Sequence, residues 1–235
     1  MQDFGEAIHL AGVLVLAADP DLVEIVLLSL KVSLSATLIA CAFGLTLGAA
    51  LATSSFPGRG AVAAILNALM GLPPVVVGLV VYLLLSNAGP LGSLRLLYTQ
   101  WAMIIAQAVL ITPIIAALSR QVIEDLHAEY AEQFASLCVP RRARIAALLW
   151  DGRFSLTTAG LAGFGRAVAE VGAVIVVGGN INHLTRVMTT TIALETSKGD
   201  LALALGLGIV LIVITLAINV CVMSLKSGAA RGAHA

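Results

Sequence analysis

The sequence predicts an all-α integral membrane protein with five transmembrane helices and a short interfacial helix before them. Of its 235 residues, 60% are hydrophobic and 11% are charged, and the mean hydropathy is +1.03. A soluble domain carries about 25% charged residues, so this chain has too few charges to cover a water-facing surface. Spans in lipid must be helices or closed barrels. The apolar runs lack the alternation typical of barrel strands, which leaves helices.

The first apolar stretch, residues 10–18, is too short to cross a bilayer, because a crossing takes about 20 residues. Asp19-Pro20 ends it, and we expect an interfacial or partly inserted helix here. Asp3 and Glu6 precede this stretch, whereas a signal peptide carries positive charge at that place. We therefore do not expect a cleaved signal.

Five longer apolar segments follow, and each is predicted to form one transmembrane helix. They are residues 22–53, 62–85, 101–118, 154–177 and 201–225. Pro73 and Pro74 interrupt the second segment, because proline lacks a donor and clashes with the preceding turn. A break at membrane depth is tolerated only inside protein or beside water. The prolines are therefore either a packing kink or part of a broken helix that lines a substrate path.

The distribution of Lys and Arg predicts the orientation, because cytoplasmic loops are richer in these residues. With the N-terminus outside, three cationic residues lie in outside loops: Arg95, Arg186 and Lys198. Eight then lie in the cytoplasm: Arg59, Arg120, Arg141, Arg142, Arg144, Arg153, Lys226 and Arg231. We therefore expect the N-terminus outside and the C-terminus inside.

Small residues mark the faces through which helices pack in lipid. Gly44 and Gly48 form a GxxxG pair, and Gly160, Gly163 and Gly165 cluster in the fourth segment. Packing within one chain and packing in a dimer are both consistent with these glycines. We find no internal repeat, so a symmetric central path needs a second copy of the chain. A homodimer is therefore expected.

Arg166 and Glu170 are ionisable residues inside the fourth predicted span. Four residues apart, they share one helix face. Charged groups within the membrane are costly and usually point into a bundle or a cavity. Three roles remain open: a structural ion pair, a gate between two copies, or direct contact of Arg166 with a transported anion.

The segment from residue 120 to residue 153 is the longest predicted cytoplasmic stretch. Apolar residues recur in it at three- and four-residue spacing and predict one helical face: Ile123, Leu126, Tyr130, Phe134 and Leu137. The acidic residues near its start fit the positive end of a helix dipole: Glu124, Asp125, Glu129 and Glu132. With Pro140 as a breaker, two short helices are expected. They are either a structural connector or a docking element for another protein.

From Glu129 to Ile145 this segment resembles the EAA loop of bacterial ABC importer permeases. In that family the loop forms the coupling helix that docks on the ATPase subunit. The resemblance assigns coupling to Glu129, Ala131, Phe134, Ala135, Leu137, Arg141 and Ile145. The chain departs from the family pattern at Tyr130, where the family has Ala, at Ala135, where it has Gly, and after Ile145, where it has Leu-Pro.

Further segments resemble the molybdate and tungstate permeases of the same family, and the tungstate group most closely. They are Ser55-Phe56-Pro57-Gly58, Leu72-Pro73-Pro74, and residues 163–173, 178–181, 185–190 and 194–200. The resemblance implies one ABC transporter transmembrane domain over residues 1–235 in a bacterial or archaeal cell (inner) membrane. It also implies a homodimer, cytoplasmic ATPase subunits and a binding protein that delivers the anion. The chain has no GxxxxGK[ST] phosphate loop, so ATP and Mg²⁺ are expected on the ATPase subunit and no cofactor here.

A tetrahedral dianion in a low dielectric must be paired or hydrogen-bonded, and several weak contacts suit transit better than one tight site. Residues 178–200 look neither like a span nor like a plain loop, and they either form an outside loop or dip into the outer leaflet. The candidates for the path or gate are Pro73, Pro74, Arg166, Glu170, Gly178, Gly179, Asn180, Thr189, Thr190 and Thr191.

Other function classes fit the sequence less well. A secondary transporter or channel is the alternative, although it needs no docking helix. An intramembrane enzyme is not expected, because the four histidines lie outside the predicted spans: His9, His127, His183 and His234. Cys41, Cys138 and Cys221 lie far apart and are expected to be small buried residues, without a disulfide or a metal. The zero net charge gives no indication of a nucleic-acid partner.

Overall fold

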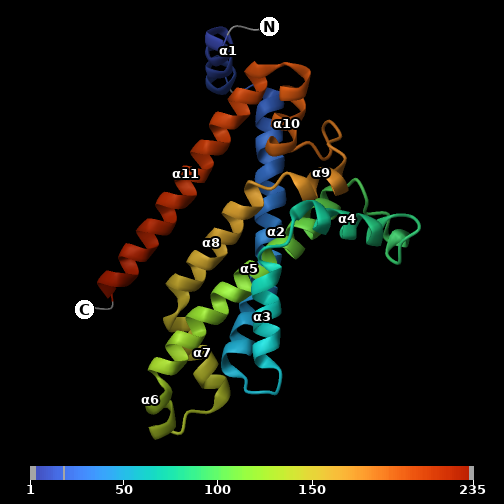
Figure 1. The fold of residues 1–235 in the computed structure, drawn as a ribbon. Helices are drawn as coiled ribbons and strands as arrows, with labels where there is room; N and C mark the ends of the chain where they lie inside the picture. The colour runs from blue at the N-terminus through green and yellow to red at the C-terminus, as the bar shows by residue number, and fades with distance from the viewer. Residues whose placement is uncertain (1–3, 18, 233–235) are drawn as a thin grey trace. The chain divides into compact units, whose positions relative to one another are not determined.

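The computed structural model describes residues 4–17 and 19–232, and all regular elements in these ranges are helices (Figure 1). The described residues form two compact units. The first comprises residues up to Ala36, residues 73–107 and residues 165–219. The second comprises residues 37–72, residues 108–164 and the residues from Val220 onward. The all-α prediction is thus confirmed for the described residues.

Within the described residues, three helices are long and apolar enough to cross a membrane without a break. They are α2 (Pro20–Thr53), α5 (Gln100–Glu129) and the first 21 residues of α11 (Leu201–Gly232). The N-terminal helix α1 (Phe4–Leu16) has 13 residues and is too short to cross, as predicted for the first apolar stretch. Ala18, the last residue of that stretch, lies outside the described residues.

Two further candidate spans are bent pairs of helices. The first pair, α3 (Arg59–Leu69) and α4 (Pro74–Leu85), turns by 102° at its break, and the second, α8 (Arg153–Val168) and α9 (Gly172–Gly178), turns by 59°. Five spans result if each pair counts as one span. The break at the two prolines was predicted. The continuous helix expected over residues 154–177 is wrong, because residues 169–171 separate α8 from α9.

The first break follows directly from the two prolines. Pro73 has an extended ψ of 123°, as expected for a residue that precedes proline. Pro74 is the first residue of α4, a position where its missing N–H costs no helical hydrogen bond. Met70, with an αR conformation, ends α3. The break therefore lies where the local sequence requires it.

The GxxxG pair packs within the chain, in the second unit. A Cβ atom added to Gly48 would lie 2.6 Å from the Ala116 carbonyl oxygen and 2.8 Å from the Arg120 nitrogen, both in α5. One added to Gly44 would lie 2.9 Å from Ile115 Cγ2. These glycines let the backbones of α2 and α5 approach each other. Of the two interpretations of the pair, packing inside one chain is correct.

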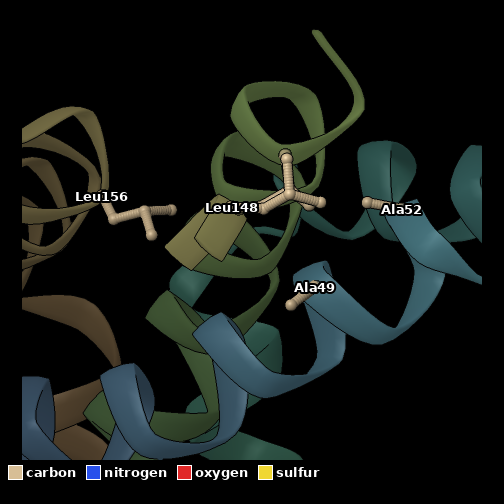
Figure 2. Packing of buried hydrophobic residues seen from close by; sticks show 5 residues of the cluster. Ala49, Ala52, Leu148 and Leu156 are labelled. Atoms are coloured by element: carbon tan, nitrogen blue, oxygen red, sulfur yellow. The ribbon is translucent and has the colours of Figure 1, made fainter. Parts of the chain in front are cut away.

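A buried apolar cluster in the second unit fixes helix α7 (Arg141–Asp151). Leu148 of α7 is fully buried and packs with Ala49 and Ala52 of α2 and with Leu156 of α8 (Figure 2). Ile123 of α5 completes the cluster. Each fully buried leucine stabilises a fold by about 1.5–3 kcal/mol. The cluster therefore holds one end of the predicted docking segment firmly in place.

The cysteine prediction is partly wrong. All three thiols are free, so they form no disulfide. Cys138 and Cys221 are exposed rather than buried, and Cys41 is half-buried. Cys138 lies in the turn after α6 (Ala131–Ser136) with a φ of 51°. A turn at the surface offers no apolar neighbours to cover a side chain.

We predict that Gly48→Ala destabilises the protein by about 1–3 kcal/mol, because the new methyl group meets backbone atoms that cannot turn away. Thermal unfolding of the purified protein in detergent measures the effect. Gly208→Ala is the matched control, since among the described residues no heavy atom beyond its own stretch of helix lies within 4 Å of its added Cβ. Equal melting temperatures for the two variants would contradict the close approach of α2 and α5.

Candidate functional site

The break between α8 and α9 contains the two charged residues that the sequence singled out. Arg166 lies in the last turn of α8, and Glu170 lies between the helices rather than within a continuous one. Their contact nevertheless forms, with Arg166 Nη1 3.0 Å from Glu170 Oε2. A cation at a helix C-terminus and an anion before a helix N-terminus both fit the local dipoles. Glu170 Oε1 also accepts a hydrogen bond of 3.2 Å from the Ala173 N–H in the first turn of α9.

Two side chains from elsewhere in the first unit donate to backbone carbonyl groups at this break, and the Ala167 carbonyl also accepts a hydrogen bond of 3.2 Å from the Glu170 N–H. Gln107 Nε2 donates to the backbone carbonyl oxygen of Ala167 at 3.0 Å. Thr189 Oγ1 donates to the backbone carbonyl oxygen of Glu170 at 2.7 Å. Buried backbone groups need such partners. Gln107 was missed in the sequence, although a lone amide inside the apolar run 101–118 is a signal that could have identified it.

The three threonines proposed as anion donors are buried, and their hydroxyls are engaged inside the protein. Thr190 Oγ1 lies 2.9 Å from Asn180 Oδ1 and 3.0 Å from the Val187 oxygen. Thr191 Oγ1 donates to the same Val187 oxygen at 2.7 Å. They belong to helix α10 (Met188–Lys198), so this stretch is not a plain loop. In this conformation the threonines stabilise the fold and are not available to an anion.

The turn from Gly178 to Asn180 is tightly packed. Gly179 ends α9 with a φ of 71°, a left-handed conformation that glycine adopts readily. The Gly178 oxygen accepts a hydrogen bond of 2.6 Å from Thr185 Oγ1. Asn180 Nδ2 donates to the Thr190 oxygen at 3.4 Å. The polar groups of this turn are thus also bonded within the chain.

Helices α4 and α9 pack against each other, and this contact brings the prolines close to the second break. A Cβ atom added to Gly78 of α4 would lie 2.8 Å from the Ala173 Cα. At the start of both helices, one added to Gly172 would lie 2.7 Å from a methyl group of Val75. The beginning of α4 just after Pro74 therefore contacts the beginning of α9 just after Glu170.

Pro140 separates two short helices of the predicted docking segment, as expected, but the apolar pattern before it is divided between two helices. Helix α5 continues to Glu129, and α6 and α7 follow as separate helices. The apolar face is interrupted, because Ile123 is buried whereas Leu137 is 74% exposed. The dipole argument for the acidic residues is wrong, since Glu124 and Glu129 lie near the C-terminal end of α5.

Glu124 is instead held by two arginines, one on each carboxylate oxygen. Arg120 Nη1 donates to Oε2 at 2.6 Å, and Arg59 Nη2 contacts Oε1. Arg59 also donates to the carbonyl groups of Leu51 and Ala52 at the end of α2. This network ties the start of α3 to α5 within the second unit.

Three further contacts hold α6 and α7 in place. Tyr130 Oη donates to Asp151 Oδ2 at 2.6 Å, and the guanidinium of Arg144 lies 5.5 Å from the centre of the Phe134 ring. Arg141 Nη2 donates to Ser54 Oγ at 2.7 Å. Of the predicted coupling residues, Phe134 and Ile145 are half-buried. The others are exposed: Glu129, Ala131, Ala135, Leu137 and Arg141.

Comparison with known proteins identifies the family. No protein-family model matches the chain. The chain is 39% identical over 226 residues to the tungstate uptake system permease protein of Peptoclostridium acidaminophilum, covering 96% of this chain and 99% of the relative. The chain belongs to the ABC transporter permease family. A probable anion ABC transporter permease of Haloferax volcanii is 38% identical over 187 residues, 77% of this chain and 80% of its own length. A sulfate transport system permease of Escherichia coli is 29% identical over 165 residues, 67% of this chain and 60% of its own.

Family membership confirms the resemblance stated from the sequence. The protein is a multi-pass membrane permease subunit of an ABC transporter, and not an enzyme. In such a transporter the ATPase is a separate subunit. The alternative of a secondary transporter or channel is thereby excluded.

We predict that Arg166→Ala lowers the stability of the permease by about 1–3 kcal/mol, because it leaves the buried carboxylate of Glu170 without its ion pair. This loss of stability is smaller than the loss expected for a fully buried ion pair, because the Arg166 side chain is 39% exposed. Thermal unfolding in detergent measures the loss. Adding Glu170→Gln, which keeps an acceptor for the Ala173 N–H, should restore part of it. A double variant less stable than Arg166→Ala would count against the ion pair.

The hydrogen bond to Asp151, followed by the charge of that carboxylate, raises the pKa of Tyr130 above its ordinary value of 10.0. Tyr130 therefore keeps its proton to a higher pH in the folded protein than in the unfolded chain. Its contribution to stability is complete below pH of about 10 and is lost as the pH rises through the raised pKa. We predict that Asp151→Ala lowers the pKa of Tyr130 in a spectrophotometric titration. Asp125→Ala is the control, and equal pKa values in both variants would contradict the contact.

Proposed function

We propose that two copies of this chain form the path of an ATP-driven importer of tungstate or molybdate. The observation that carries this proposal is the match to a tungstate uptake permease along nearly the whole length of both chains. Sulfate permeases match less closely and over a smaller share of their length. The partners proposed are a second copy, cytoplasmic ATPase subunits that bind ATP and Mg²⁺, and a binding protein outside the cell.

The charge arrangement at the helix break supports a role for Arg166 in the path or gate. Its side chain is 39% exposed, whereas that of Glu170 is 2% exposed. A guanidinium has five N–H donors, and the pair with Glu170 leaves most of them free to meet an anion or the second copy. Because Glu170 already offsets the positive charge, an anion would be held weakly there. Weak contacts suit transit.

The other candidates support the path rather than donate to the anion. The hydroxyls of Thr189, Thr190 and Thr191 are bonded to backbone or side-chain oxygens of the chain itself. Pro73 and Pro74 set the start of α4, which packs against α9. We infer that these residues, with Gly178, Gly179 and Asn180, fix the position of the two short helices beside the path.

The segment from residue 120 to residue 153 is proposed to transmit force from the ATPase subunit. Its exposed side chains combine the apolar Leu137 with charges of both signs at Glu129 and Arg141, a combination that suits docking and register on a partner. Contacts within the second unit then link this surface to α2 and α5. They include the Arg141–Ser54 and Tyr130–Asp151 hydrogen bonds.

The function is tested with vesicles that contain the permease together with its ATPase and binding protein. We expect ATP-dependent uptake of tungstate and molybdate, and much slower uptake of sulfate. Uptake that continues without the ATPase would contradict the proposal. Uptake of sulfate in preference to the two metal oxyanions would assign the chain to a different substrate.

We predict that Leu137→Ser weakens association with the ATPase subunit about 10-fold, the effect of losing about 1.4 kcal/mol. The side chain is 74% exposed, so its removal costs this chain little by itself. Co-purification with the ATPase subunit measures the effect, and Leu94→Ser, at an exposed leucine of the first unit, is the matched control. Equal recovery of the ATPase with both variants would exclude Leu137 from the interface.

A further inference from the structure

A small polar cavity lies beside the break between α8 and α9, within the first unit. Its volume is about 10 Å³, which is enough for about one water molecule. The polar side chains that line it are Ser29, Ser33, Gln107, Glu170 and Thr189. All five are buried.

Two acceptor atoms on the lining residues have no hydrogen-bond donor. They are Gln107 Oε1 and Glu170 Oε2, each almost inaccessible to solvent. Arg166 Nη1 is 3.0 Å from the carboxylate oxygen but does not meet the geometry of a hydrogen bond. Buried acceptors without a donor are rare in native proteins and require an explanation.

The other polar groups of the cavity already have partners. Ser29 Oγ donates to the Ile25 oxygen and accepts from the Met188 N–H, both at 2.7 Å. Thr189 Oγ1 donates to the backbone carbonyl oxygen of Glu170, and Ser33 also has an interaction partner. No side chain that lines the cavity donates a hydrogen bond to either acceptor, and Arg166 contacts Glu170 Oε2 only as an ion pair.

We propose that this cavity binds one water molecule, which donates one hydrogen to Gln107 Oε1 and the other to Glu170 Oε2. A water has the two donors that the site lacks and the size that the cavity allows. A metal cation fits less well, because the guanidinium of Arg166 next to Glu170 already offsets the carboxylate charge and would repel a second cation.

With this water, Gln107 of α5 makes two connections to the break between α8 and α9. Its amide donates directly to the Ala167 oxygen, and its oxygen reaches Glu170 through the water. Gln107 is therefore a positioning residue for the start of α9. This consequence rests on the proposed function only where it concerns transport, since the water site itself does not depend on any substrate.

The first test is a density map of the purified transporter that resolves ordered water. We expect one peak about 2.7–3.2 Å from both acceptor atoms, and no peak in Gln107→Met. Gln100→Met, a substitution on the same helix outside the cavity, should keep the peak. An empty cavity in the unsubstituted protein would overturn the proposal. So would a direct hydrogen bond between Glu170 Oε2 and Gln107 Oε1, because two acceptor oxygens can bond only if the carboxyl group carries a proton.

The second test separates water from a cation. Melting temperatures in sodium, potassium and choline chloride of equal ionic strength should agree. A sodium-specific increase that is lost in Glu170→Gln would overturn the proposal in favour of a cation site.

The third test concerns the positioning role. We expect Gln107→Met to lower the maximal rate of anion uptake several-fold without changing the half-saturating anion concentration, and Gln100→Met to change neither. A change in half-saturation alone would place Gln107 in contact with the anion and overturn this role. If the complete transporter moves none of the tested anions, the proposed function fails, whereas the density peak still decides the water site.

Discussion

The structure depends on one constraint: a backbone group in lipid must find its hydrogen-bond partner inside the protein. A straight helix meets this constraint by itself, but a broken one does not. At the break after α8, the carbonyl groups of Ala167 and Glu170 are bonded by side chains that lie 60 and 19 residues away in the sequence. The side chains of α5 and α10 thus add donors at this break, beside the backbone hydrogen bond from the Glu170 N–H to the Ala167 oxygen.

The same constraint explains why so few polar side chains remain available at the candidate path. Thr190 and Asn180 bond to each other, and Thr185 bonds to the last residue of α9. Their donors fix a short helix that has only seven residues and could not hold its position alone. The guanidinium of Arg166 stays partly exposed, whereas the carboxylate of Glu170, its partner in the ion pair, is buried.

Hydropathy and proline positions predicted most of the fold, because both act locally. The long helices α2 and α11 and the break at Pro73-Pro74 follow from the composition of each segment. The break after Val168 was not predictable in this way, since residues 169–171 contain neither glycine nor proline and their partners are remote. Likewise, the helical pattern from Ile123 onward did not show that these residues continue α5 to Glu129, where contacts with Arg59 and with the cluster around Leu148 stabilise the last turns of the helix. The sequence identified Arg166 and Glu170 but missed Gln107, whose role appears only when α5 lies beside the break.

The close contact between α2 and α5 has a consequence for assembly. Gly44 and Gly48 are covered by α5, so this small-residue surface is already occupied before a second copy arrives. A twofold contact cannot use these two glycines and would form on faces that stay exposed, such as the valines of α4. Contacts of that kind interlock less closely than glycine faces, and they can separate and re-form as a transporter opens and closes.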